Sequence, residues 1–285
     1  MKSHFFLSAA LILMAAFVSC NKESKPDVPD LDARVVEVSS PKMKIYFPKT
    51  EGKLCRFVIA CPGGGYSGIP GADGYEGAFY KDLFNEAGYA LAVLYYTLPN
   101  GDCNKPVDDI ENALKLVREK AEEWYVDKNQ VGVMGFSAGG HLASYAATQS
   151  TGSARPDFQV LFYPVITMEA GKTHAGSRNN LLGSNPSAEI VAMFSNHLNV
   201  TESTPRAFIA YAESDGTVPP QYNGAAYFSA LTAKGIPVTR YVYPGSRHGW
   251  HWGMVVFDGE TRNDGTKYEN LDDVKQKLSV WLRSF

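Results

Sequence analysis

Residues 135–140 read GFSAGG, and this short stretch decides how the chain is organised. It fits the pattern Gly-x-Ser-x-Gly, in which a serine stands on a sharp turn between a strand and a helix. The flanks supply that context, because residues 131–134 are apolar and residues 141–147 are rich in helix formers. We therefore predict that Ser137 is lifted off a sheet edge and that the Ala138 amide faces the same space. A glycine-rich turn with an incidental serine is the alternative.

A serine on such a turn needs a base, and the base needs an acid that orients it. Two later strand-like segments run into loops that hold suitable side chains: residues 206–211 precede Asp215, and residues 238–243 precede His248. The carboxyl ends of parallel strands meet at one edge of a sheet, so both residues are expected beside Ser137. We predict a catalytic triad of Ser137, Asp215 and His248.

Two members of this triad have rivals. Glu213 is a second acid, but it stands so close to the end of the strand that Asp215 is preferred. His251 is a second base, but the tryptophans on both sides of it are typical of a packed histidine, whereas Gly249 follows His248 and frees its ring. The other histidines downstream of the leader are interpreted as structural, namely His141, His174 and His197.

A glycine triplet follows another strand-like segment. Residues 54–60 are mostly apolar and run into 61–66, which read CPGGGY. Glycines at this point let the chain bring bare amides close to the nucleophile, where they can stabilise an oxyanion. We assign this role to the backbone N–H groups of Gly64, Gly65 and Ala138.

Together these motifs resemble the α/β-hydrolase esterases related to acetylxylan and feruloyl esterases, close to the hormone-sensitive-lipase group. The likeness runs from about residue 45 to about residue 253, and its motifs lie at 62–66, 76–77, 106–110, 135–143 and 176–183. The resemblance implies a serine esterase that removes short acyl groups, acetyl or feruloyl, from an oligosaccharide or polysaccharide. It also implies the chain order serine, acid, histidine, which this sequence has.

The chain departs from the usual pattern of these esterases at several positions. Cys61-Pro62 stands where many lipases and esterases have the histidine of His-Gly-Gly-Gly. Ser214 replaces a second aspartate beside the triad acid, and Arg247 replaces the usual glycine before His248. A cation beside the base could bind an anionic substrate, so Arg247 is a candidate residue of the substrate pocket.

Composition agrees with one α/β domain. The chain has 285 residues, of which 45% are hydrophobic, and its net charge of −3 gives no basic surface for nucleic acid. No metal-ligand cluster or cofactor motif is present in the sequence. Strands are expected at 34–38, 43–47, 54–61, 89–96, 130–136, 158–163, 206–212 and 238–243, and helices at 75–87, 106–123, 138–149, 220–234 and 266–283. This alternation predicts a mostly parallel sheet with helices on both faces.

The sheet pattern is interrupted between residues 165 and 204 by polar sequence with one amphipathic piece, 188–194. We expect a short lid-like insertion that overhangs the site. Tyr66, Trp250 and Trp252 flank the catalytic elements. They are candidates to stack on a sugar or line an acyl pocket, although core packing is the preferred interpretation for any one of them.

The N-terminus has the pattern of an export signal. Lys2 is followed by an apolar run at 5–18, which is too short to span a bilayer, and Cys20 closes it. We predict a signal peptide at 1–19, lipidation of Cys20, a polar tether at 20–31 and a hydrolase domain at 32–285. The expected location is the periplasm or outer membrane of a bacterium, with the lipid as the only membrane contact. An ordinary signal peptide is the alternative.

Three further cysteines leave an odd number after lipidation. Cys55 and Cys61 bracket one strand, which holds them roughly 20 Å apart and prevents a bond between them. We expect buried thiols, with one bridge to Cys103 as the alternative. For the whole chain, a prolyl-oligopeptidase-like peptidase and a non-catalytic glycan-binding lipoprotein are the alternatives to an esterase.

Overall fold

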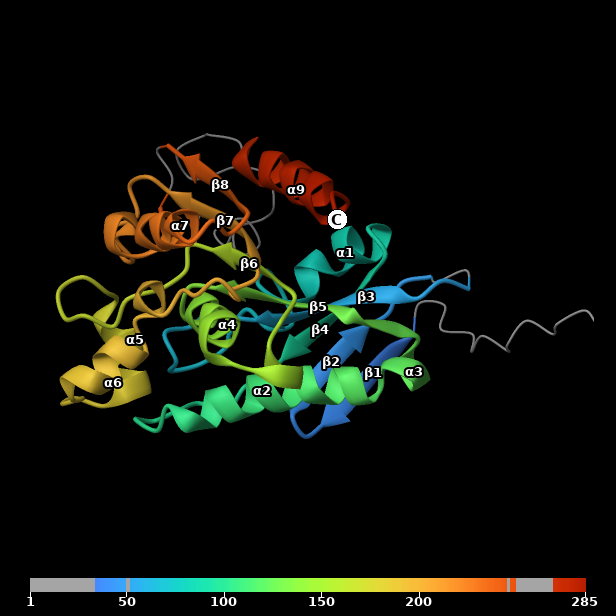
Figure 1. The fold of residues 1–285 in the computed structure, drawn as a ribbon, viewed down its shortest axis with the longest axis horizontal. Helices are drawn as coiled ribbons and strands as arrows, with labels where there is room; N and C mark the ends of the chain where they lie inside the picture. Colours follow the sequence, from blue (N-terminus) through green and yellow to red (C-terminus); the bar gives the residue numbers. More distant parts are fainter. Residues whose placement is uncertain (1–33, 50–51, 245–246, 250–268) are drawn as a thin grey trace, which may run out of the picture.

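One eight-stranded sheet runs through the described part of this computed structural model, which comprises residues 34–49, 52–244, 247–249 and 269–285. The strand order is β1-β2-β4-β3-β5-β6-β7-β8 (Figure 1). The β1–β2 and β2–β4 pairs are antiparallel and all other neighbours are parallel, so the predicted sheet type is confirmed. The bounds are β1 Val35–Ser39, β2 Lys42–Tyr46, β3 Cys55–Cys61, β4 Tyr89–Leu94, β5 Val126–Phe136, β6 Phe158–Phe162, β7 Arg206–Ala212 and β8 Val238–Tyr243.

The central strands are apolar throughout because both faces of the sheet are covered. Every residue of β4 and of β6 is buried, whereas the edge strand β1 alternates between exposed and half-buried residues. A fully buried parallel strand needs no polar face, which explains the unbroken apolar runs in the sequence.

Helices cover the sheet on two sides. Figure 1 shows α1 and α9 on one face and α2, α4 and α7 on the other. Trp281 of α9 packs edge-on against Phe158 and Phe208 of the sheet, which fixes that helix to the core. The helix bounds are α1 Lys81–Glu86, α2 Asn104–Glu119, α3 Ala121–Trp124, α4 Ala138–Gln149, α5 Ala175–Leu182, α6 Ala188–Met193, α7 Gly224–Ala233 and α9 Glu269–Leu282.

Some helix boundaries differ from the expected ones. The expected helix at 75–87 is a series of turns, a short 3₁₀ segment at Ala78–Tyr80 and then α1. The expected helix at 106–123 is divided into α2 and α3, and α3 ends where Tyr125 adopts a left-handed conformation with φ 57°. Glycine-rich sequence before α1 and the left-handed residue after α3 both break the regular helical bond pattern.

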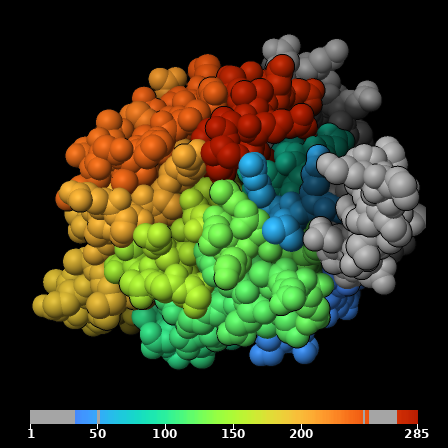
Figure 2. Space-filling view, turned by 45° about the vertical axis from the view of Figure 1, so that its right-hand side comes forward, coloured from blue at the N-terminus to red at the C-terminus, as the bar shows by residue number. Residues whose placement is uncertain are grey.

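The insertion between β6 and β7 contains α5, α6 and a 3₁₀ segment at Asn196–Leu198. Its gold part projects at one side of the molecule in Figure 2. No helix in the described ranges combines the length and hydropathy that a membrane span requires. The cysteines that the structure describes are free thiols, with Cys55 and Cys61 buried and Cys103 half-buried. The predicted signal, tether and lipidated Cys20 lie outside the described residues.

Candidate active site

Ser137 stands on a strained turn between β5 and α4. Its φ of 51° and ψ of −118° fall in a region that residues with a Cβ rarely adopt. The turn is tight enough that a Cβ on Gly139 would lie 2.0 Å from the Cys61 carbonyl oxygen, so only glycine fits there. Ser137 therefore adopts the unfavourable backbone conformation, because the close packing around the turn prevents a less strained one.

Ser137 is joined by hydrogen bonds to the two predicted partners. His248 Nε2 lies 2.8 Å from Ser137 Oγ, and His248 Nδ1 lies 2.7 Å from Asp215 Oδ2. A nitrogen facing a carboxylate holds the proton, so Nδ1–H donates to Asp215 and Nε2 accepts from the serine hydroxyl. In this arrangement the imidazole can take the serine proton, and the carboxylate can stabilise the imidazolium that forms.

The acid of this set is buried and fully hydrogen-bonded. The Asp215 side chain is 1% exposed, and its Oδ1 accepts the backbone N–H groups of Thr217 at 3.0 Å and Val218 at 2.8 Å. Glu213 is exposed instead. The loop after β7 thus holds Asp215 in place through its own amides. His251 lies outside the described residues.

The glycine triplet lies beside the serine turn because β3 and β5 end together, with Cys61 opposite Gly135. Gly64 has a φ of 125°, and a Cβ there would lie 2.1 Å from the Gly68 carbonyl oxygen. Neither the Gly64 nor the Gly65 amide donates a hydrogen bond to any residue that the structure describes. Both glycines line the same pocket as Ser137, so their amides are available to an oxyanion there.

Glu76 holds this glycine turn from behind, a role that the sequence did not reveal. Its carboxylate accepts the Gly63 N–H at 2.6 Å and the Tyr163 hydroxyl at 2.9 Å, and the residue is 4% exposed. Burial raises the pKa of the Glu76 carboxyl, while these two hydrogen bonds oppose the rise. Tyr163 in turn packs edge-on against the His248 ring, with 4.9 Å between ring centroids. Glu76 therefore links the glycine turn to the residue that flanks the base.

Tyr66 packs in the core and is not among the residues that line the pocket, which agrees with the preferred interpretation for a single aromatic residue. It is 1% exposed, and its hydroxyl donates to His141 Nδ1 at 2.9 Å. His141 Nε2–H donates to the Phe194 carbonyl oxygen at 2.8 Å. Burial lowers the pKa of His141 to about 4, so the ring is neutral and serves as a structural link, as expected for this histidine. An aromatic residue after a glycine turn can pack inward as well as outward, and here it supports the turn from the core side.

The cleft over Ser137 is a pocket of about 240 Å³. Gly64, Gly65, Glu76 and Tyr163 line it together with Ser137, His248, Pro70, Thr217, Gly249 and His174. Arg247 is exposed and is not among the lining residues, and Trp250 lies outside the described residues. No group of three or more His, Cys, Asp or Glu side chains within the described ranges is placed to hold a metal ion.

The insertion supports the glycine turn directly. The side chain of Asn180, in α5, donates from Nδ2 to the Gly65 carbonyl oxygen at 2.9 Å. The backbone carbonyl oxygen of Asn180 accepts the Gly101 N–H at 2.7 Å. His174, which the sequence suggested to be structural, lines the pocket beside Gly65. The segment expected to overhang the site therefore also helps to build it.

Comparisons with known proteins agree with this geometry. The model of one protein family, BD-FAE, matches residues 43–227. An acetylxylan esterase of Xylanibacter ruminicola is 37% identical over 232 residues, which make up 80% of this chain and 45% of that protein. The present chain thus spans less than half the length of that relative.

Solved structures show the same fold. An acetyl ester-xyloside bifunctional hydrolase from Caldicellulosiruptor lactoaceticus is 28% identical, and the match covers 93% of each chain with a TM-score of 0.73. An α/β-hydrolase from a deep-sea metagenome library is 21% identical, with a TM-score of 0.68 over 88% of this chain and 98% of that one. The predicted α/β-hydrolase fold is confirmed.

Proposed function

The chain belongs to the BD-FAE family, and from this premise we propose that it is a serine esterase that removes short acyl groups from carbohydrate. The observation that carries the proposal is the hydrogen-bonded set of Ser137, His248 and Asp215, at 2.8 and 2.7 Å, beside a glycine turn with free amides. A protein that only binds glycan has no need of this set.

The proposed reaction proceeds through an acyl-serine. Ser137 Oγ attacks the ester carbonyl carbon while His248 Nε2 takes its proton, and the carbonyl oxygen becomes an oxyanion that the Gly64, Gly65 and Ala138 amides stabilise. His248 then gives the proton to the departing sugar oxygen. A water molecule, deprotonated by the same nitrogen, attacks the acyl carbon, and His248 then gives this proton to Ser137 Oγ as the acid leaves. Asp215 keeps the imidazole in the tautomer that each step needs.

Acetyl is the acyl group that the site favours, with feruloyl as a second candidate. A pocket of about 240 Å³ that also has to admit part of the alcohol leaves little room for a long chain. The names of two similar proteins, an acetylxylan esterase and an acetyl ester-xyloside hydrolase, support the same substrate class. Acetylated xylan is therefore the proposed natural substrate.

The test is a comparison of acyl groups and of alcohols with the purified protein lacking the predicted leader. We expect acetate release from acetylated xylan, and a higher kcat/KM on 4-nitrophenyl acetate than on the octanoate. Added methylenes that find no pocket gain nothing, whereas a well-formed acyl pocket gains roughly 1–3 kcal/mol for each one. A preference for octanoate contradicts the short-acyl proposal and favours a lipase. Cleavage of a proline-containing peptide favours the peptidase, and xylan binding with no ester hydrolysis favours the glycan-binding protein.

We also propose that the protein is exported and lipid-anchored through Cys20. The apolar run at 5–18 and the cysteine that closes it support this proposal. Metabolic labelling with a fatty acid in a bacterial host is expected to mark the wild-type protein in the membrane fraction and to leave Cys20→Ser unlabelled. Labelling of both proteins, or of neither, contradicts the assignment.

A further inference from the structure

The insertion brings a histidine into the cleft that the proposed reaction does not use. His174 lines the pocket with Ser137 and His248. Its ring lies over the glycine turn, since a Cβ built on Gly65 would be 3.4 Å from His174 Cε1. The residue is half-buried, and it stands within reach of a molecule bound at the serine.

The hydrogen bonds of His174 fix which of its nitrogens carries the proton. The Ser177 backbone N–H donates to His174 Nδ1 at 3.2 Å, and the Ser177 hydroxyl lies 2.9 Å from the same nitrogen. A nitrogen that accepts a backbone N–H has no proton of its own, so the neutral ring carries it on Nε2. Burial, and then the neighbouring His248, lower the pKa of His174 and keep the ring neutral, although Asp215 acts in the opposite direction. Nε2–H donates to no residue within the described ranges.

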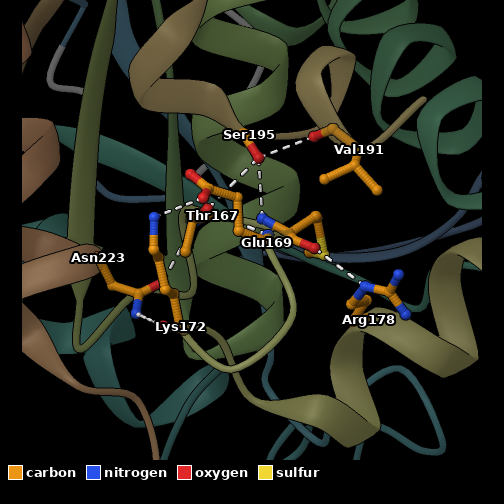
Figure 3. Close-up of polar contacts among 8 residues, drawn as sticks. Thr167, Glu169, Lys172, Arg178, Val191, Ser195 and Asn223 are labelled. Carbon is orange, nitrogen blue, oxygen red and sulfur yellow. Dashed lines mark hydrogen bonds and ion pairs between the residues drawn. The ribbon is translucent and has the colours of Figure 1, made fainter. Parts of the chain in front are cut away.

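A network of buried polar contacts holds the loop that leads to this histidine (Figure 3). Asn223 accepts the Ile166 and Thr167 amides at 2.9 and 3.2 Å and donates to the Lys172 carbonyl at 3.1 Å. Ser195 accepts the Met168 amide at 3.0 Å.

Arg178 closes the same network from α5. Its Nε donates to the Met168 carbonyl oxygen at 3.0 Å. Arg178 is labelled in Figure 3. Both ends of the loop are thus fixed before a substrate arrives. A donor held in place in this way loses little conformational entropy when a ligand binds, and such preorganisation favours specific binding.

His174 shares the pocket with His248, the base of the proposed reaction. His248 has to protonate the departing oxygen, so the sugar lies toward the base. His174 lines the pocket with His248 and with Thr217 of the acid loop, and His248 and Asp215 both affect the pKa of His174. On the basis of the proposed function, we propose that His174 is a specificity-determining residue whose Nε2–H donates to an oxygen of the sugar next to the acylated position.

The test uses substrates that differ in their alcohol and variants that differ in reach. In His174→Asn, residue 174 can still cap α5 by accepting the Ser177 N–H, but its side chain is too short to contact the sugar. His174→Gln has a longer side chain and restores a hydrogen-bond donor to the sugar. Glu189→Gln, an exposed change on the same insertion, is the matched control. Each protein is assayed on an acetylated xylo-oligosaccharide and on 4-nitrophenyl acetate, which has no sugar oxygen.

We expect His174→Asn to lose about 10-fold or more in kcat/KM on the oligosaccharide and less than about 2-fold on the aryl ester, the size of effect typical of a lost substrate hydrogen bond. Partial recovery on the oligosaccharide in His174→Gln is expected as well. An equal loss of kcat/KM on both substrates would show that the His174 ring acts through the Gly65 turn. No loss on either substrate would show that the ring does not bind the substrate. Either result overturns the proposal. A wild-type enzyme that is active on the aryl ester alone would overturn the carbohydrate assignment on which the proposal rests.

Discussion

The molecule holds the same polar unit twice, a hydroxyl, an imidazole and an oxygen acceptor joined by hydrogen bonds. At the cleft the unit consists of Ser137, His248 and Asp215, and the imidazole is 18% exposed. In the layer between α4 and the insertion it consists of Tyr66, His141 and the Phe194 carbonyl, and the histidine is 1% exposed.

The two units differ in the acceptor and in access to water. A carboxylate carries a full charge that stabilises an imidazolium, whereas a carbonyl carries only a partial one. Burial without a counter-charge lowers the pKa of His141 to about 4, so that ring cannot take a proton near neutral pH. The same connectivity is therefore reactive in one place and structural in the other, and the charge of the acceptor and the burial decide which.

The largest expected effect follows from breaking the cleft unit. Ser137→Ala and His248→Ala are each expected to lower kcat by about 10³-fold or more, because nucleophile and base act as one device. Denaturant unfolding is expected to give midpoints close to the wild type, and a serine-directed phosphonate is expected to label the wild type at Ser137. Labelling of another residue contradicts the assignment.

The next effect concerns the buried unit and pH. The unfolded chain binds a proton at His141 near its ordinary pKa of 6.5, while the folded chain resists it down to about 4. The free energy of unfolding is therefore expected to fall as pH decreases between these values, by up to about 3 kcal/mol from this residue alone. Urea unfolding at pH 7 and pH 4.5 measures the loss.

His141→Asn isolates this contribution from those of other groups. His174 and His197 have lowered pKa values and act in the same direction, whereas the raised pKa of Glu76 acts in the opposite one. The variant is expected to be less stable at pH 7 but to depend less steeply on pH. An unchanged slope would mean that His141 takes up its proton in the folded state as readily as in the unfolded chain.

A smaller effect is expected from Tyr66→Phe. The change leaves His141 Nδ1 buried without its donor, which costs about 1–2 kcal/mol of stability. Tyr66 lies on the core side of the glycine turn and takes no part in the reaction itself. We therefore expect kcat to stay within about 3-fold of the wild-type value, because the change acts on the site only indirectly. A loss of kcat comparable to that of Ser137→Ala would remove the distinction between the two units.

The smallest effect is expected from Arg247→Gln. Arg247 is exposed, and water and salt screen the interaction of an exposed charge with the base. We expect kcat/KM to change by less than about 2-fold across the pH range, measured at physiological ionic strength. A large change confined to the acid limb would show that the guanidinium faces His248.

The serine turn and its partners were predictable because their signals are local. A strand, a glycine-flanked serine and a helix are read from a dozen neighbouring residues, and chain order then places Asp215 and His248 at the same sheet edge. Residues 76–77 belong to the motifs of the resemblance, but the role of Glu76 was not predictable, because its partner Tyr163 lies 87 residues further along the chain. The place of Tyr66 stayed open in the sequence because an aromatic side chain suits both a pocket wall and a core, and only the position of His141 decides between them.

Asn180 gives the insertion a significance for evolution and engineering. Its hydrogen bond to the Gly65 carbonyl oxygen, at 2.9 Å, joins the insertion to the glycine turn beside Ser137. Replacing residues 165–204 by the corresponding segment of a relative therefore also changes the contacts of the glycine turn. A graft that lacks an asparagine at this position is expected to loosen the Gly65 turn, to which we assign the stabilisation of the oxyanion. In the proposed esterase, sugar preference and turnover are therefore expected to change together when this segment is exchanged.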